Sequence, residues 1–297
     1  MTDITLLDGG MGQELLARAG DRPTPLWATQ VMMDHPTLVR DVHADYFAAG
    51  ATIATTNSYA IHHDRLMTAG IVHLYHALHL RALAQAVEAR DAHGRGRIAG
   101  SLGPLVASYR PDLTQPLAEA AAKYAENSAL MAPHVDLFLI ETASSILQAE
   151  GALAGIVQGR PVWLSISVDD ADGHLLRSGE PVEDVARLVR DYAPEAVLVN
   201  CSVPEAMAAA MDVVRAFGLP FGAYANGFTH ITADFKADQP TVDALHSRHD
   251  LTPAKYVDFA MGWVAQGATI VGGCCEVGPA HIRALAEALR AAGHTIV

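Results

Sequence analysis

The sequence predicts an α/β protein with a (β/α)8 TIM-barrel fold, and three observations support this prediction. Eight short apolar segments alternate with longer segments of helical periodicity, and 297 residues is a length typical of one barrel. Each short segment is apolar on both faces, as in a parallel sheet that helices cover. No linker or low-complexity tract interrupts the alternation, so residues 1–297 are expected to form one domain. A doubly wound open sheet is the alternative, because a strand count that is wrong by one or two would make one fold look like the other.

The predicted strands are short apolar runs that contain many β-branched residues. In order they cover residues 4–8, 51–56, 97–101, 136–141, 162–168, 196–200, 220–224 and 269–272. The helices between them are located by capping residues, by proline at their starts and by apolar spacing. Asp34 is expected to cap a helix that ends at Gly50, and further helices are expected over residues 71–92 and 116–131, from Pro181, and from Pro279 to near Gly293.

The longest segment without a clear pattern covers residues 227–251, between the seventh strand and the helix that follows it. Loops of this length in a compact domain usually have a function of their own. We therefore expect this segment to be a lid or a binding loop.

Composition and charge exclude several classes of partner. Hydrophobic residues make up 51% of the chain and charged residues 18%, which is typical of a globular protein. The net charge is −13 and no basic stripe is present, so neither nucleic acid nor an anionic membrane is an expected partner. The chain has no apolar run of about 20 residues and no signal-like start, so a cytoplasmic protein is expected. No feature of the sequence indicates an oligomeric state.

All three cysteines follow the carboxyl ends of predicted strands. Cys201 follows the sixth strand, and Cys274 and Cys275 follow the eighth. Barrel strands converge on one face at these ends, so three thiols there predict a catalytic zinc site with an open fourth position. A substrate thiol with a pKa of about 8.5 would become a thiolate on binding zinc. The alternatives are buried apolar side chains and a disulfide between the adjacent Cys274 and Cys275.

Other polar residues lie at the same predicted strand ends and are expected to line the same site. They are Asp8 with the Gly9 and Gly10 that follow it, Thr56, Asn57, Ser101, Glu141 and Asn226. No strand end is informative by itself, but their coincidence with the cysteines indicates one active site at the carboxyl ends of the strands.

Several other patterns are set aside. A dinucleotide loop after the first strand is not expected, because Leu15 occupies the third glycine position. No Gly-x-Ser-x-Gly motif indicates a serine hydrolase. A glycosidase pair of Asp8 and Glu141 would leave the cysteines unexplained. His62, His63, His73, His76 and His79 lie on or near an outer helix, so we interpret them as a partly solvated face and not as a metal site.

Motifs spread over nearly the whole chain resemble the homocysteine S-methyltransferase family. They are Asp8-Gly9-Gly10-Met11-Gly12, Pro25-Leu26-Trp27, His43-Ala44-Asp45-Tyr46, Asn57-Ser58-Tyr59, Ser101-Leu102-Gly103-Pro104, Glu141-Thr142, Asn200-Cys201, Gly272-Gly273-Cys274-Cys275 and Pro279-Ala280-His281-Ile282. The Asn-Cys and Gly-Gly-Cys-Cys motifs at this separation are the specific part of the resemblance.

The resemblance implies a zinc barrel that methylates homocysteine to methionine, with Cys201, Cys274 and Cys275 as the zinc ligands. Asp8 and Glu141 would hold the substrate ammonium, which needs a carboxylate partner when it is buried. Backbone N–H groups of the turn at residues 9–12 would take the substrate carboxylate. Asn226 matches a family asparagine near zinc and would fill the fourth site when substrate is absent.

The expected methyl donor is S-methylmethionine or S-adenosylmethionine. The chain lacks the additional domains of folate- or cobalamin-using members and the additional C-terminal sequence of betaine-using members. Trp27 would contact a sulfonium through its ring face, or else serve as a core aromatic residue. Glu276, where many members have glycine, and Ala225, where relatives often have proline, are departures that bear on the choice of donor.

Three alternatives to this function remain open. The first is the same zinc site with betaine as donor or selenocysteine as acceptor. The second is a non-catalytic barrel that stores zinc or senses thiol oxidation. The third is a metal-free carboxylate hydrolase, for which Cys201→Ser would be harmless.

Overall fold

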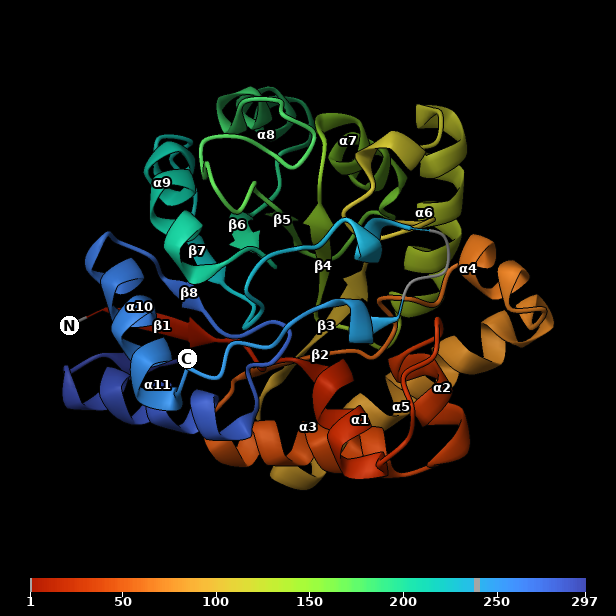
Figure 1. The fold of residues 1–297 in the computed structure, drawn as a ribbon, viewed down its shortest axis with the longest axis horizontal. Coiled ribbons are helices and arrows are strands. Elements are labelled where there is room, and N and C mark those ends of the chain that lie inside the picture. The colour runs from red at the N-terminus through yellow and green to blue at the C-terminus, as the bar shows by residue number, and fades with distance from the viewer. Residues whose placement is uncertain (1, 238–240) are drawn as a thin grey trace.

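The computed structural model describes residues 2–237 and 241–297, and its centre is a curled parallel sheet surrounded by helices (Figure 1). The strand order is β2-β3-β4-β5-β6-β7-β8-β1-β9, and every neighbouring pair is parallel. The strands are β1 (Asp3–Leu6), β2 (Ile53–Thr55), β3 (Arg97–Leu102), β4 (Leu137–Ala143), β5 (Val162–Ile166), β6 (Ala196–Asn200), β7 (Phe221–Tyr224), β8 (Ile270–Val271) and β9 (Thr295–Ile296).

The ring closes between β1 and β2. Leu7 forms a parallel bridge with Ile53, and the Thr52 amide donates a hydrogen bond of 2.7 Å to the Leu6 carbonyl. The interior of the ring is filled by apolar side chains that come from all eight barrel strands or the residues next to them, as in a closed barrel. These side chains are Leu7, Ile53, Ala99, Leu137, Leu139, Trp163, Ala196, Leu198, Tyr224 and Ile270. The predicted TIM-barrel fold is thereby confirmed over the open sheet.

The eight predicted strands are all present, and their ends differ from the prediction by at most two residues, with β6 matching at both ends. A ninth strand, β9, was not predicted. It pairs with β1 through Asp3 and Thr295 and through Ile4 and Ile296. A two-residue strand at the end of the chain is too short to show a period of two, so only its partner strand defines it.

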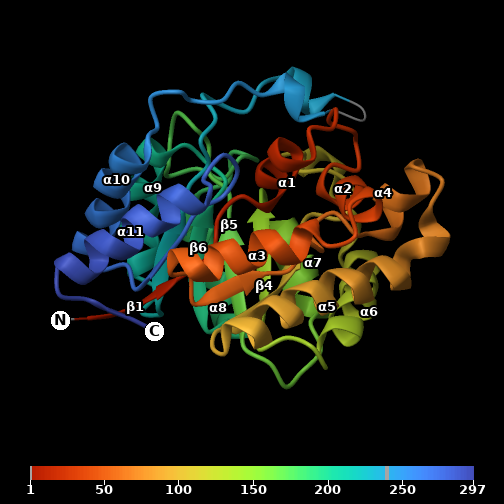
Figure 2. The same cartoon turned by 90° about the horizontal axis from the view of Figure 1, so that it is seen from below.

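The outer layer consists of helices, which Figures 1 and 2 show around the sheet. They are α1 (Met11–Ala19), α2 (Ala28–Asp34), α3 (Leu38–Ala49), α4 (His63–Thr68), α5 (Tyr75–His93), α6 (Leu117–Met131), α7 (Ile146–Gly155), α8 (Val185–Tyr192), α9 (Pro204–Arg215), α10 (Pro253–Ala265) and α11 (Pro279–Ala291). Short 3-10 helices lie at Val72–Leu74, Pro111–Leu113, Val182–Asp184, Asp234–Lys236 and Val242–Ala244. Among the described residues, no helix has both the length and the apolar character needed to cross a membrane.

The predicted helix signals were mostly correct. Gly50 ends α3 in the left-handed conformation that a residue without a Cβ adopts easily. The prediction that Asp34 caps this helix was wrong, because Asp34 is the last residue of α2 and Thr37 precedes α3. Pro181 precedes a 3-10 turn that continues into α8.

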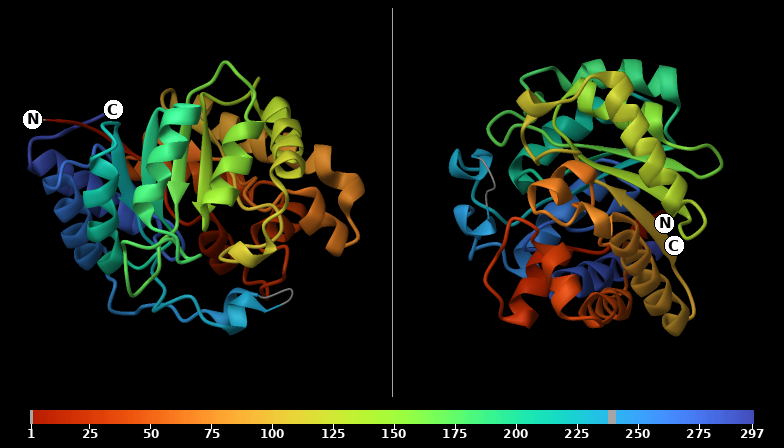
Figure 3. Two further views of the ribbon diagram at one scale, coloured as in Figure 1. Left: turned by 90° about the horizontal axis from the view of Figure 1, so that it is seen from above. Right: turned by 90° about the vertical axis from the view of Figure 1, so that its right-hand side faces the viewer.

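The segment at residues 227–251 crosses one end of the barrel, and the two termini lie at the other end (Figures 2 and 3). The carboxyl ends of the strands face this segment (Figure 3). Residues 238–240 of the segment lie outside the described residues. The segment therefore covers the end of the barrel where sequence analysis placed the site.

Candidate active site

A cavity of ≈ 930 Å³, counting its open mouth, lies at the carboxyl ends of the strands. Apolar and aromatic side chains form much of its wall, as is usual for small-molecule sites. It brings together eleven of the twelve residues that the sequence predicted for the site: Asp8, Gly9, Gly10, Trp27, Thr56, Asn57, Ser101, Glu141, Cys201, Cys274 and Cys275.

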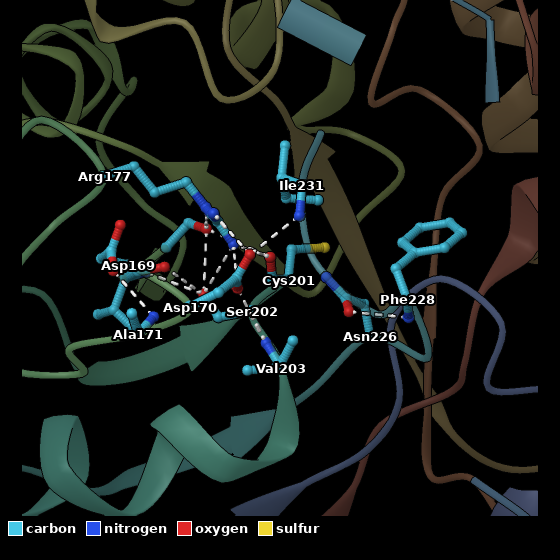
Figure 4. A network of polar contacts seen from close by, with 12 residues as sticks. Asp169, Asp170, Ala171, Arg177, Cys201, Ser202, Val203, Asn226, Phe228 and Ile231 are labelled. Atoms are coloured by element: carbon cyan, nitrogen blue, oxygen red, sulfur yellow. Dashed lines mark hydrogen bonds and ion pairs between the residues drawn. The ribbon is translucent and has the colours of Figure 1, made fainter. Parts of the chain in front are cut away.

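Asn226 is the predicted site residue that does not line this cavity. Its side chain is buried, and its carboxamide oxygen accepts a hydrogen bond of 3.1 Å from the Phe228 amide (Figure 4). The side-chain nitrogen is buried without a hydrogen-bond partner. Asn226 therefore contacts the backbone of the loop that starts at Gly227, an orientation that no sequence pattern predicted.

The three cysteines form one cluster, in which the Sγ atoms all lie within 4.8 Å of one another. The structure joins Cys201 and Cys274 in a disulfide, and Cys275 is free and buried. The adjacent-pair disulfide between Cys274 and Cys275 was therefore the wrong alternative. The Cα atoms of Cys201 and Cys274 are 5.8 Å apart, which is an ordinary separation for a disulfide.

The same cluster fits a tetrahedral metal ion once the disulfide is reduced. Four ligands at Zn–S bonds of about 2.3 Å lie about 3.8 Å from one another. The Sγ atoms of Cys274 and Cys275 are 4.0 Å apart, close to that spacing. Burial, followed by the charges of Glu276 and Glu141, raises the pKa of the Cys275 thiol to about 12. Such a thiol stays protonated at pH 7 unless a cation compensates for its charge, which is what a bound metal does.

Glycines bring the cysteine segment close to the first strand. A Cβ on Gly9 would lie 2.0 Å from the Val277 carbonyl oxygen, and one on Gly10 would lie 2.6 Å from the Cys274 carbonyl oxygen. The Gly10 amide donates a hydrogen bond to the backbone carbonyl of Val277, and the Gly273 amide donates one to the backbone carbonyl of Asp8, each at 2.9 Å. The glycines after Asp8 are therefore needed because two backbone segments pack directly against each other here.

Backbone strain is concentrated around the cavity. Among the described residues, six that are not glycine have a positive φ, and all except Ala193 line the cavity or follow Cys275: Trp27, Tyr109, Thr142, Cys201 and Glu276. Such conformations cost on the order of 1–3 kcal/mol each and cluster at functional sites. Glu276 has a φ of 66°, which explains why glycine is the residue expected at that position.

Two carboxyl groups face the cavity, the buried Asp8 just after β1 and the partly buried Glu141 in β4. Asp8 accepts hydrogen bonds of 2.7 Å from both the amide and the hydroxyl of Thr55. Glu141 accepts a hydrogen bond from the Ser101 hydroxyl, and the Tyr224 hydroxyl donates to it at 3.1 Å. Burial raises the pKa of each carboxyl to about 7, although these hydrogen bonds oppose the shift. A cation placed between the two groups would lower both pKa values, so the pair is suited to an ammonium.

Aromatic rings form a second part of the wall. The rings of Trp27 and Tyr59 meet edge to face at 6.4 Å, and those of Tyr109 and Phe235 lie 5.9 Å apart. The indole nitrogen of Trp27 is buried without a hydrogen-bond partner. Trp27 packs against the main core and also lines the cavity, so its core role is confirmed and its contact with a sulfonium stays a prediction. Tyr109 was not predicted as a site residue, and Phe235 was included only within the loop at residues 227–251.

Gln13 is a further polar residue that sequence analysis missed. It lines the cavity one turn into α1, and both polar atoms of its carboxamide are buried without a partner that satisfies hydrogen-bond geometry. Its side chain lies close enough to Cys275 to lower the pKa of that thiol slightly. In the sequence, only its position after the Gly9-Gly10 turn indicated that Gln13 could lie in the site.

The histidines outside the cavity are of two kinds. His73 and His76 are exposed, as predicted, but His62 and His79 are buried. Burial lowers the pKa of both buried rings, and His79 Nε2 lies 3.0 Å from the Ile61 carbonyl oxygen. In the part of the chain that the structure describes, the cysteines form the one group of three with metal-binding geometry.

The fold and the cavity define a class of protein, the barrel enzymes that place their chemistry at the carboxyl ends of the strands. Residues 5–289 match the model of the family described as homocysteine S-methyltransferase. The chain is also 32% identical over 303 residues to the homocysteine S-methyltransferase of Escherichia coli strain K12, covering 95% of this chain and 94% of that protein.

Two solved structures are similar over almost the whole barrel. They are the metallated and the oxidized forms of the homocysteine methyltransferase MmuM from Escherichia coli, at 27% and 28% identity. Each has a TM-score of 0.81 and covers 97% of this chain and 96% of that chain. This chain therefore belongs to the homocysteine S-methyltransferase family, as its motifs predicted, and is an enzyme of the methyltransferase class.

Proposed function

We propose that this enzyme transfers a methyl group to the thiolate of L-homocysteine, giving L-methionine, at a zinc ion held by Cys201, Cys274 and Cys275. The observation that supports it most is the cluster of three thiols beside two carboxyl groups in one cavity. An all-sulfur donor set favours zinc over magnesium or calcium, which prefer oxygen. The related MmuM has been solved in a metallated form, which supports a metal-dependent enzyme.

Binding of the amino-acid end is assigned to the β1 and β4 side of the cavity. Asp8 and Glu141 take the substrate ammonium, because both line the cavity and, among the described residues, neither has a basic side chain as its hydrogen-bond partner. The first turn of α1, which begins at Met11, has amide groups without intrahelical partners, and these take the substrate carboxylate. The amino-acid end is thereby held while its side chain extends toward the cysteines.

A zinc ion bound by the cysteines would supply the positive charge that keeps the homocysteine thiol deprotonated. The chain itself then needs no general base for the attacking sulfur. The aromatic wall excludes water from the space beside the cysteines and holds the methyl donor. Reduced thiols are required, which suits the reducing conditions of the cytoplasm, where we place the protein.

The proposed donor is S-methylmethionine or S-adenosylmethionine. Both carry a sulfonium, and an aromatic ring face attracts such a cation. Trp27 and Tyr59 offer rings at the cavity wall. Betaine carries a quaternary ammonium that aromatic rings also attract, so the choice among donors depends on measurement.

The test is methionine formation by reduced, zinc-loaded protein that receives homocysteine and one of these three donors. We expect turnover with a sulfonium donor, and none after a chelator has removed the metal. Turnover with betaine alone would overturn the donor assignment. No turnover with any donor would overturn the proposed reaction. Chelator-resistant turnover would overturn the role of the metal.

A further inference from the structure

A buried ion pair outside the cavity holds the backbone of Cys201 (Figure 4). The guanidinium of Arg177 donates to both carboxylate oxygens of Asp170, at 2.8 and 3.2 Å. Its side chain is 4% exposed and that of Asp170 is 15% exposed. One nitrogen of the same guanidinium also donates to the Cys201 carbonyl at 3.0 Å. The guanidinium of Arg177 therefore binds both the Asp170 carboxylate and the backbone of a residue in the cysteine cluster.

Further contacts fix this ion pair in place. Arg177 Nε donates to the Ser167 hydroxyl at 2.7 Å, and that hydroxyl in turn lies 3.3 Å from the Cys201 carbonyl. Asp170 accepts from the amides of Val203 and Ile231, at 3.2 and 3.0 Å. Burial raises the pKa of Asp170, but the charge of Arg177 and these amides outweigh it and hold the pKa below its ordinary value.

Cys201 needs such support because its φ is 50°. A cysteine in this left-handed conformation returns to a negative φ when nothing holds its flanking peptide groups. This change to a negative φ would also alter the direction of the Cα–Cβ bond of Cys201 and move its sulfur away from Cys274 and Cys275. The Cys201 carbonyl is therefore the group through which the placement of this sulfur is controlled.

We propose that Arg177 and Asp170 are positioning residues that hold Cys201 in its left-handed conformation and so place its sulfur for metal binding. This inference rests on the metal site proposed above. Arg177 also lies over the ring of Tyr109, with its guanidinium carbon 4.8 Å from the ring centre. The same cation thus contacts the cysteine backbone and the aromatic wall of the cavity.

The test compares two double variants of the full-length, reduced protein. Arg177→Met with Asp170→Asn removes both charges together, because loss of one alone would leave the other buried and unpaired. The matched control is Arg187→Met with Glu150→Gln, which removes a two-bond ion pair of 2.7 and 2.8 Å far from the cysteines. Zinc affinity is measured by competition with a chromophoric chelator, and thermal unfolding is followed for all proteins.

We expect zinc affinity to fall about 10- to 100-fold in the Arg177 and Asp170 variant, the usual effect of losing support behind a metal ligand. The control should bind zinc as the unmodified protein does. With Co²⁺ in place of zinc, the thiolate-to-cobalt absorption should weaken only in the first variant. A purely structural role would lower the unfolding temperature and leave affinity and spectrum unchanged.

Two results separate this inference from the function on which it rests. If the unmodified protein fails to bind zinc, the proposed metal site is wrong and the positioning role is wrong with it. If the unmodified protein binds zinc and the Arg177 and Asp170 variant binds it equally well, only the positioning role is overturned. Should the double variant not fold, Arg177→Lys keeps the charge beside Asp170 but loses the planar fork, and the same loss of affinity is expected.

Discussion

The two sides of the cavity are built differently. On the β1 and β4 side, neither Asp8 nor Glu141 has a positive φ, and both have hydrogen-bond partners, which are Thr55, Ser101 and Tyr224. On the β6 and β8 side, Cys201 is strained, and its sulfur is bonded to Cys274. The first side is already formed for a ligand. The second requires reduction of a covalent bond and support from Arg177 before three thiolates are available.

We therefore expect substrate binding and thiol reactivity to be separable in this enzyme. The carboxyl side should recognise the amino-acid end of a substrate with or without metal. The cysteine side should determine whether the bound thiol reacts. The predictions below either separate the two sides or show that they act as one unit.

The largest effect is expected from Cys275→Ala, which removes a metal ligand. Methionine formation should fall by on the order of 10³-fold or more, because several kcal/mol of charge stabilisation are lost. Methionine binding, measured by calorimetry, should change little, since Asp8 and Glu141 are untouched. A parallel loss of methionine affinity would show that the two sides are coupled.

The converse variant is Asp8→Asn, which leaves the cysteines intact. Removing one partner of a buried charge pair costs about 2–5 kcal/mol, so kcat/KM for homocysteine should fall by about 30-fold or more. Zinc content, measured by atomic absorption, should equal that of the unmodified protein. Loss of the metal in this variant would contradict the separation.

The pH dependence of ligand binding should reflect the carboxyl side alone. Burial raises the pKa values of Asp8 and Glu141 to about 7, so each is protonated below that pH unless a cation is bound beside it. An ammonium needs the ionised form, so methionine affinity should fall as the pH is lowered from 8 to 6. The loss should reach about tenfold per pH unit below 7. Affinity that is constant over this range would mean that the two carboxyls remain ionised.

The same raised pKa values have a consequence for stability. The folded state binds protons at pH 5 to 6 that the unfolded state has released, so this contribution favours folding at low pH. It is lost as the pH rises through about 7. Denaturant unfolding of Asp8→Asn at pH 5.5 and 8 should show a smaller difference between the two pH values than the unmodified protein shows.

The smallest effect is expected from Glu276→Gly, which relieves the strain of a φ of 66° beside the cysteines. The free energy of unfolding should rise by up to about 1 kcal/mol. Ala193→Gly is the matched control, because Ala193 has a φ of 47° at the end of α8, away from the cavity. Both variants should be stabilised in denaturant titrations, and only Glu276→Gly should alter the relative rates with different donors.

Much of the site could be predicted because the barrel rule converts strand ends into spatial neighbours. Asp8, Glu141 and the cysteines are far apart in sequence, yet all lie at or near the carboxyl ends of barrel strands and all line one cavity. Asn226 follows a strand in the same way but lies outside the cavity lining. The end of a strand determines where the backbone of a residue lies. The direction of its side chain depends on the conformation of the residues that follow.

The eight barrel strands, the family and the end of the barrel that carries the site could be predicted from the sequence, because apolar periodicity and motif spacing can be read along the chain. The pairing of Cys201 with Cys274, the hydrogen bond from Arg177 to the Cys201 carbonyl and the place of Phe235 in the aromatic wall could be seen only in the folded molecule. Each of these depends on the approach of segments distant in sequence and on side-chain direction, and neither leaves a periodic trace in the sequence.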